Sequence, residues 1–203
     1  MDQATIKRHL DALAKLDPDL RRGLELVRYP APRIRVQGFE TFLSTIVAQQ
    51  ISTEAAASIM RRVQALLPSM EAQDVLRLPA GALRAAGLSA RKVEYVEALA
   101  RAIDENQFDI SNLAAMEDQA VVEAITALRG FGVWSAEIYL MFSLQRRDIF
   151  PAGDLAIRIA LQKLKRVDSK LGEKQAREMV ESWAPYRSAG SLFLWHYYRG
   201  APT

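Results

Sequence analysis

Asp154 is the residue whose surroundings most suggest chemistry. It ends the stretch FPAGD, in which Pro151 and Gly153 break the chain, and it precedes the apolar helical pattern LAIRIAL. An aspartate in that position commonly caps a helix by accepting a hydrogen bond from one of the first N–H groups. A fixed carboxylate is also what stabilises a sugar cation while a glycosidic bond breaks. The residue types leave both roles open, and the two roles are compatible.

The sequence does not favour a two-carboxylate mechanism, because no second acidic residue lies nearby in a comparable position. One carboxylate suffices when the leaving base is electron-poor. Alkylated purines carry a positive charge, which reduces the need for a general acid and also favours stacking on aromatic faces. Core packing is the alternative role for each candidate aromatic wall, and we favour it for the tyrosines. The candidates are Trp134, Trp195, Tyr139 and Tyr95.

A second feature is the stretch ALRGFGVWSAE, in which Gly130 and Gly132 separate two helical patterns. Glycine permits positive φ and the close approach of another backbone. The helix that starts at Val133 or Trp134 presents N–H groups and the positive end of its dipole, which suit a phosphate oxygen. A DNA backbone could be held there without any base being read. The alternative is a tight connection between two core helices with nothing bound.

The elements that position these residues are expected to be helices. Apolar residues recur at three- and four-residue spacings, and only the stretch IRV could be extended. We therefore expect an all-α protein, with a joint at the prolines of RYPAP and a lobe that begins near Phe39. The pattern predicts one helix from 133 or 134 to Gln145, and later helices near 155–165, 173–183 and 188–198.

Composition excludes several classes of site. The 203 residues include no cysteine and only two histidines, so disulfides, thiolate nucleophiles and iron–sulfur clusters are ruled out. The formal net charge of +3 permits an anionic partner without requiring one. No stretch reaches the roughly 18 uninterrupted apolar residues of a membrane span. We expect a cytoplasmic protein with no membrane partner, associated with the nucleoid in a bacterium, or a nuclear protein in a eukaryote.

Taken together, four stretches resemble the helix-hairpin-helix (HhH-GPD) DNA glycosylase superfamily, and within it the 3-methyladenine DNA glycosylase II family. These stretches are TIVAQQISTEAAASIMRRV, LRAAGLSARKVEYVEALA, LRGFGVWSAEIYLMFSLQRRDIFPAGDLAIR and APYRSAGSLFLWHYY. The resemblance implies an all-α fold of two helical lobes, with a lesion flipped into a cleft between them. The expected lobes are residues 1–37 with 147–203, and residues 38–146, which include the helix-hairpin-helix at about 118–145.

The resemblance also implies roles for individual residues. Asp154 matches the catalytic aspartate. The base pocket would comprise Trp134, Trp195, Tyr139 and Ile138, although some family members carry a tyrosine where this chain has Ile138. Gln50 or Ile51 would be the wedge that fills the gap left by the flipped base. The residues expected to bind the DNA backbone are Arg129, Gly130, Phe131, Gly132 and Trp134.

The expected activity is hydrolysis of the N-glycosidic bond of alkylated purines, 3-methyladenine and 7-methylguanine, in double-stranded DNA. Relatives that also cut the strand carry a lysine where this chain has Trp134, so the chain should be monofunctional and leave an abasic site. We expect a monomer with no cofactor and no certain metal; a monovalent cation at carbonyls near Gly130 and Gly132 is one possibility. The alternatives are a related glycosylase for ethenoadenine or deaminated bases, and a non-catalytic DNA-binding protein.

Overall fold

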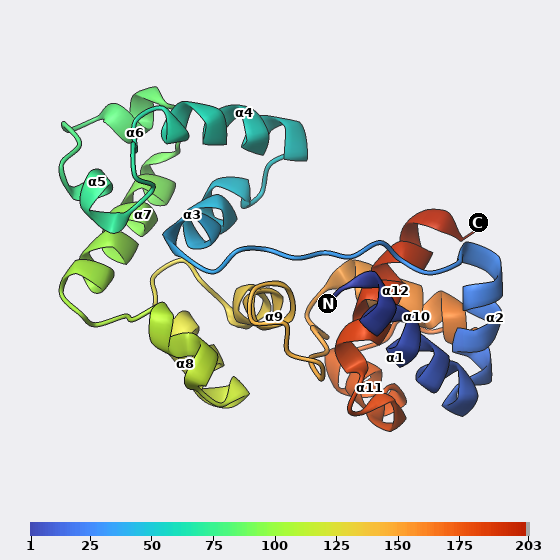
Figure 1. Ribbon diagram of the computed structural model, residues 1–203. Coiled ribbons are helices and arrows are strands. Elements are labelled where there is room, and N and C mark those ends of the chain that lie inside the picture. Colours follow the sequence, from blue (N-terminus) through green and yellow to red (C-terminus); the bar gives the residue numbers. More distant parts are fainter. Residues whose placement is uncertain (202–203) are drawn as a thin grey trace. The chain divides into compact units, whose positions relative to one another are not determined.

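The computed structural model describes residues 1–201, and every regular element within them is a helix (Figure 1). The all-α class expected from the periodicity is therefore confirmed. None of the helices in this part of the chain has the length and apolar character needed to cross a lipid bilayer.

The chain divides into two compact units. Unit 1 comprises Met1–Ile34 and the chain from Glu137 onward, and unit 2 comprises Arg35–Ala136. The sequence placed the boundaries after residues 37 and 146, whereas the structure has them after residues 34 and 136. The second boundary lies earlier because the part of the chain after Ala136 packs within unit 1: Glu137 pairs with Arg177, and the ring of Phe142 lies 5.7 Å from that of Trp195.

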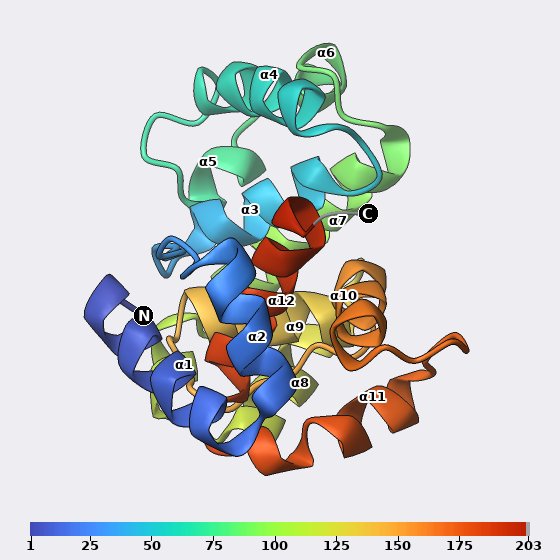
Figure 2. The same cartoon turned by 90° about the vertical axis from the view of Figure 1, so that its right-hand side faces the viewer.

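In unit 1, α12 contacts α1, α2 and α10, and Figure 2 shows it beside α2 and α10. Seven consecutive residues of α12, Ser188–Leu194, are buried, so this helix forms the centre of the unit's core. The helices of unit 1 are α1 (Gln3–Leu16), α2 (Pro18–Val27), α10 (Leu155–Lys165), α11 (Glu173–Met179), the 3-10 helix η2 (Glu181–Trp183) and α12 (Arg187–Gly200).

Asp17 connects three elements of this core. Its buried carboxylate caps α2 and accepts hydrogen bonds from Lys165 Nζ at 2.6 Å and from Trp183 Nε1 at 2.7 Å. Burial opposes ionisation, but these donors outweigh it and lower the pKa of Asp17. The carboxylate is thus fully engaged in structure and holds α2, α10 and η2 together.

In unit 2, α3 packs against α4 and α7. Phe42 on α3 makes edge contacts with Phe108 and Phe131, whose ring centroids lie 5.3 and 5.6 Å away. The elements of unit 2 are α3 (Phe39–Ala48), α4 (Thr53–Gln64), α5 (Ala72–Leu76), α6 (Ala82–Ala85), α7 (Ala90–Asp104), the 3-10 helix η1 (Ser111–Ala115) and α8 (Asp118–Thr126).

Helix α9 (Val133–Phe142) follows α8 and is shorter than the sequence predicted. It ends three residues before Gln145, because Gln145 adopts a left-handed conformation with φ 59°. The N–H groups of Ser143 and Leu144 both donate to the carbonyl of Tyr139, which closes the helix. We call residues 127–132, which connect α8 and α9, the glycine hairpin, and residues 143–154, which connect α9 and α10, the Asp154 loop.

Candidate active site

Asp154 is the N-cap of α10. Its Oδ1 accepts a hydrogen bond from the N–H of Ile157 at 3.0 Å, and its own N–H donates to the carbonyl of Pro151 at 2.9 Å. The side chain is half-buried. The capping role predicted from the sequence is therefore present, and it fixes the direction of the carboxylate.

The beginning of the Asp154 loop is held by α12. Arg187 grips Asp148 through two parallel hydrogen bonds of 2.7 Å, from Nε to Oδ1 and from a terminal nitrogen to Oδ2. The hydrogen bonds from Arg187 hold the pKa of Asp148 below its usual value. Ser188 adds two contacts, because its Oγ donates to the carbonyl of Arg146 at 2.7 Å and accepts from the N–H of Ile149 at 2.9 Å. The loop is thus bound at three successive places.

The middle of the Asp154 loop is held by α11. One terminal nitrogen of Arg177 donates to the carbonyl of Phe150 at 2.9 Å, and the other contacts Glu137 Oε1 at 3.0 Å. Burial raises the pKa of Glu137, and its hydrogen bond to Arg177 opposes that rise. A single guanidinium therefore connects the loop to a buried carboxylate on α9.

The glycine hairpin requires Gly130 for internal reasons. Gly130 has φ 92°, and a Cβ added to it would lie 2.3 Å from Cδ2 of Tyr95. Both the backbone conformation and the close approach of the Tyr95 ring exclude a larger residue. Tyr95, considered from the sequence as a pocket wall, packs against the hairpin instead.

Gly132 differs, because a Cβ added there would meet nothing within 4 Å and the residue is exposed. Its carbonyl accepts hydrogen bonds from the N–H groups of Ser135 and Ala136, which form the first turn of α9. The absence of a side chain at Gly132 leaves the N-terminal end of α9 open to an approaching group. Helix N-termini of this kind bind phosphate oxygens.

The other two hairpin residues contact the protein itself. Arg129 forms an exposed ion pair with Glu94 at 3.0 Å, so a phosphate would replace Glu94 as its partner. The ring of Phe131 is buried beside Phe42. Only the main chain of Phe131 is therefore suited to binding a DNA backbone, while its side chain anchors the hairpin.

The predicted wedge residues follow α3. Gln50 is exposed and adopts a left-handed φ of 56°, and Ile51 is also exposed. The preceding residue, Gln49, donates from Nε2 to the carbonyl of Gly130 at 2.9 Å. The turn that carries Gln50 and Ile51 is thus attached to the glycine hairpin within unit 2. Neither residue is part of the buried core.

The four predicted pocket residues differ in accessibility. Trp134, on the first turn of α9, is 44% exposed, whereas Ile138 and Tyr139 are buried. Trp195 is half-buried on α12, and the guanidinium of Arg33 lies over its ring at 6.0 Å and over Phe142 at 4.7 Å. Trp134 is therefore the most exposed of the four, whereas the Trp195 ring is partly covered by Arg33. Trp134 and the hairpin belong to unit 2, and Asp154 and Trp195 belong to unit 1.

The monovalent cation considered at carbonyls near Gly130 and Gly132 stays a prediction. The carbonyl of Gly130 already accepts from Gln49, and that of Gly132 accepts from two N–H groups of α9. Among the described residues there is also no group of three or more His, Asp or Glu side chains arranged for a metal ion. No step of the chemistry below uses a cation.

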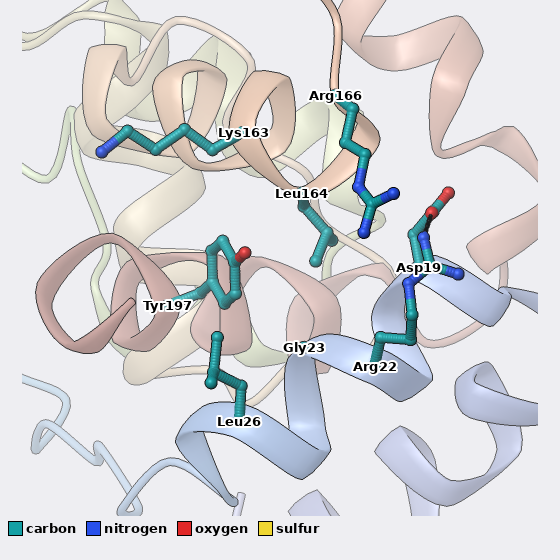
Figure 3. A pocket seen from close by; sticks show the side chains of 8 residues that line it. All are labelled: Asp19, Arg22, Gly23, Leu26, Lys163, Leu164, Arg166 and Tyr197. Carbon is teal, nitrogen blue, oxygen red and sulfur yellow. Dashed lines mark hydrogen bonds and ion pairs between the residues drawn. The ribbon is translucent and has the colours of Figure 1, made fainter. Parts of the chain in front are cut away.

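A charged hollow of about 130 Å³ lies elsewhere in unit 1. Its lining residues are Asp19, Arg22, Gly23, Leu26, Lys163, Leu164, Arg166 and Tyr197 (Figure 3). Asp19 contacts Arg22 and also Lys165, and in the figure Arg166 extends toward Asp19 while Lys163 extends away. Lys163 lies in the last turn of α10 and Arg166 caps it, where basic residues offset the helix dipole. The basic residues of the hollow thus offset the dipole of α10 or lie beside Asp19.

Sequence reasoning missed the residues that hold the Asp154 loop. They are Glu137, Asp148, Arg177, Arg187 and Ser188. Each lies within a helical or loop pattern that gives no local sign of its partner, because the paired residues are 27 to 42 positions apart. The only signal was that Asp148, like Asp154, is a carboxylate within a loop expected to carry function.

Comparisons with known proteins identify the family of this chain. The family model described as "HhH-GPD superfamily base excision DNA repair protein" matches residues 43–185. DNA-3-methyladenine glycosylase 1 of Schizosaccharomyces pombe is 28% identical, over 90% of this chain and 83% of that protein. Some other curated relatives are longer, and the chain spans 39% and 65% of two of them.

Solved structures show the same fold. The crystal structure of a DNA-3-methyladenine glycosidase from Bacillus halodurans superposes with a TM-score of 0.83 at 30% identity, and covers 94% of this chain and 89% of that one. The 3-methyladenine DNA glycosylase of Schizosaccharomyces pombe in complex with abasic DNA gives a TM-score of 0.78 at 26% identity, with 93% and 95% covered. With a family model that matches most of its length, this chain belongs to the HhH-GPD superfamily of base excision DNA repair proteins.

Proposed function

We propose that this protein is a monofunctional DNA glycosylase that removes alkylated purines, 3-methyladenine and 7-methylguanine, from double-stranded DNA and leaves an abasic site. The observation that carries the proposal is the carboxylate of Asp154, fixed at the N-terminus of α10 by Ile157 in a loop that α11 and α12 hold. The names of the relatives, DNA-3-methyladenine glycosylases, support the substrate class.

The reaction breaks the bond between the purine nitrogen and C1′ of the sugar. The alkylated base leaves with the bonding electron pair, which neutralises its positive charge, and C1′ becomes cationic. The carboxylate of Asp154 stabilises that cation. A water molecule then adds its oxygen to C1′ and gives up a proton to bulk water, so the products are the free base and an abasic sugar. Because the alkylated base is already cationic, no general acid is required.

DNA binding is assigned to unit 2. Gly132 and the N-terminus of α9 bind a backbone phosphate, and Arg129 exchanges Glu94 for a second phosphate contact. Gln50 and Ile51 fill the space that the flipped base vacates. Trp134, which is 44% exposed on α9, presents an aromatic face for stacking on the cationic base, a contact that contributes about 1–2 kcal/mol when desolvated.

The residues of the hairpin support the proposed absence of lyase activity. No lysine occurs between Asp118 and Gln145, and Trp134 stands where lyase-competent relatives carry one. Without an amine no Schiff base forms with C1′ of the abasic sugar. The DNA strand should therefore remain intact after the base is released, and borohydride should trap no covalent complex.

The test compares Asp154→Asn with the wild-type protein on methylated duplex DNA, with released 3-methyladenine and 7-methylguanine measured separately. Asparagine also caps helices well, so the variant removes the charge and keeps the cap. We expect base release to fall by at least about 100-fold, while DNA binding stays within about twofold of wild type, a change of about 0.4 kcal/mol.

Asp2→Asn is the matched control, because Asp2 caps α1 by the same contact, to Thr5 N–H at 2.7 Å. It should release both bases at the wild-type rate. Equal rates for Asp154→Asn and wild type would contradict the mechanism. Release of ethenoadenine or deaminated bases alone would replace the substrate assignment, and salt-sensitive duplex binding without any base release would leave only a DNA-binding protein.

A further inference from the structure

Phe150 is the residue through which α11 contacts the backbone that leads to Asp154. The carbonyl of Phe150 accepts from the N–H of Ala152 at 2.8 Å, and the carbonyl of Pro151 accepts from the N–H of Asp154 at 2.9 Å. These two short turns set the backbone that carries the carboxylate. A displacement of Phe150 would therefore be transmitted to Asp154 over four residues.

Helix α11 covers this turn with two side chains on one face. Arg177 donates to the Phe150 carbonyl at 2.9 Å, and Glu173, four residues earlier, lies beside Gly153, where its Oε1 would be 3.9 Å from an added Cβ. Residues four apart on a helix share a face. α11 thus packs along the Asp154 loop from Phe150 to Gly153.

Arg177 is held in turn by Glu137. The carboxylate of Glu137 is only 9% exposed, whereas the Arg177 side chain is 47% exposed, and their closest atoms are 3.0 Å apart. An ion pair whose guanidinium is half-exposed adds little stability, because solvent screens it. Stability alone is therefore a weak reason for a carboxylate at position 137. Orienting a guanidinium is a stronger one, because a planar fork bound at one nitrogen directs the other.

We propose that Arg177 is a positioning residue for Asp154, and that Glu137 orients Arg177 for this purpose. The inference rests on the proposed function, because it gives the loop a reason to be fixed. The guanidinium bridges two acceptors, Glu137 Oε1 and the Phe150 carbonyl, that no single ammonium group would join in the same geometry. Neither residue touches DNA or base in this assignment; both act through the loop.

The experiment measures three quantities for Arg177→Met, Arg177→Lys and Glu137→Gln. They are the single-turnover rate of base release, the Kd for duplex DNA with an abasic-site analogue, and hydrogen exchange of the amides of residues 149–157. Arg177→Met should lower the single-turnover rate by about 10- to 100-fold, the range expected for a displacement of about 1 Å. The Kd should stay within about twofold of wild type, a change of about 0.4 kcal/mol, and exchange at residues 152–157 should rise.

Glu137→Gln keeps the size of the side chain and loses its charge, so it should give a smaller fall in rate with the same rise in exchange. Arg177→Lys should recover part of the rate, because its ammonium can still reach one acceptor. The matched control is Arg62→Met, since Arg62 donates from Nε to the carbonyl of Ala86 at 2.8 Å in unit 2. It removes the same kind of contact and should leave the single-turnover rate unchanged.

The proposal is overturned if Arg177→Met has the wild-type rate and wild-type exchange, or if Arg62→Met loses as much rate. Should Arg177→Met not fold, Glu137→Gln and Arg177→Lys decide the question. If the wild-type protein releases no base from any substrate, the proposed function fails, and the exchange measurement still tests whether Arg177 holds the loop. If the wild-type protein is active, and the Arg177 and Glu137 variants keep its rate and its exchange, this inference fails while the proposed function stands.

Discussion

The glycine hairpin exposes main chain and is supported from within by the Tyr95 ring, the Gln49 hydrogen bond and the Phe42–Phe131 contact. The Asp154 loop is instead held by charged and hydroxyl side chains of α11 and α12. Gly132 has no protein atom within reach of an added Cβ, while the loop is bound at Asp148, Ile149 and Phe150 in succession. The outer side of the hairpin is therefore open to a ligand, whereas the Asp154 loop is fixed by its hydrogen bonds.

The difference matches the two kinds of interaction proposed for these regions. Phosphate binding by N–H groups and a helix dipole tolerates small shifts, because it reads no base and acts through diffuse charge. Stabilising a sugar cation requires a carboxylate within a fraction of an ångström of its position. The hairpin can therefore rely on backbone, whereas the Asp154 loop needs side chains from two other helices.

The largest effect on stability is expected at the inner side of the hairpin. Gly130→Ala forces a side chain into a left-handed conformation, which costs about 1–2 kcal/mol, and into the Tyr95 ring, where overpacking costs about 1–3 kcal/mol. We expect the free energy of unfolding to fall by about 3 kcal/mol, measured by urea denaturation. A loss below about 0.5 kcal/mol, the level of an ordinary surface change, would show that the Tyr95 contact does not constrain the hairpin.

An intermediate effect is expected at Arg187. Arg187→Met removes two charge-assisted hydrogen bonds to Asp148 and should lower the free energy of unfolding by about 2 kcal/mol at neutral pH. The pKa of Asp148 is lowered in the folded protein, mainly by Arg187, so its contribution is present above the unfolded pKa and is lost as pH falls through the folded value. The difference between variant and wild type should therefore shrink below about pH 4.

Arg101→Met serves as the control for that measurement, because Arg101 pairs with Glu97 at 3.8 Å on the surface of α7. Exposed pairs of this kind contribute about 0–1 kcal/mol. If the Arg187 and Arg101 variants unfolded at the same urea concentration, or if the Arg187 deficit were equal at pH 3 and pH 7, the grip on Asp148 would not be what holds the loop.

The smallest effect is expected at the outer side of the hairpin, and in binding rather than stability. Gly132→Ala adds a methyl group that meets nothing in the protein, so the free energy of unfolding should change by less than about 0.5 kcal/mol. The same methyl group stands where a phosphate would approach α9. Duplex affinity at fixed salt should fall about three- to tenfold, or about 1 kcal/mol. Unchanged affinity would move the phosphate site away from Gly132.

The sequence was sufficient wherever a feature depends on neighbouring residues. The N-cap at Asp154, the helix Leu155–Lys165 and the all-α class were all predictable from local pattern. The end of α9 was not, since nothing nearby marks the left-handed conformation of Gln145. The roles assigned to the pocket, wedge and backbone-binding residues stay predictions.

Contacts between distant residues were beyond the sequence for a physical reason. Tyr95 under Gly130 and Arg177 between Glu137 and Phe150 depend on how helices pack, and helix packing is decided by the shape of whole faces rather than by one residue's neighbours. In the sequence, two charged residues that form a salt bridge cannot be told from two that are separately solvated. Only coordinates distinguish the two cases.

The grip of α11 and α12 on the Asp154 loop limits how the site could be transplanted. Arg177 lies 27 residues beyond Phe150, and Arg187 lies 39 residues beyond Asp148. Residues 118–161 include every motif visible in the sequence from the hairpin to Asp154. If they were grafted alone onto another protein, the side chains that fix the carboxylate would be missing. A transplanted segment that ends before Arg177 would therefore carry Asp154 without the side chains that fix its carboxylate, and one that begins at α8 would lack Tyr95 and Gln49, which support the hairpin.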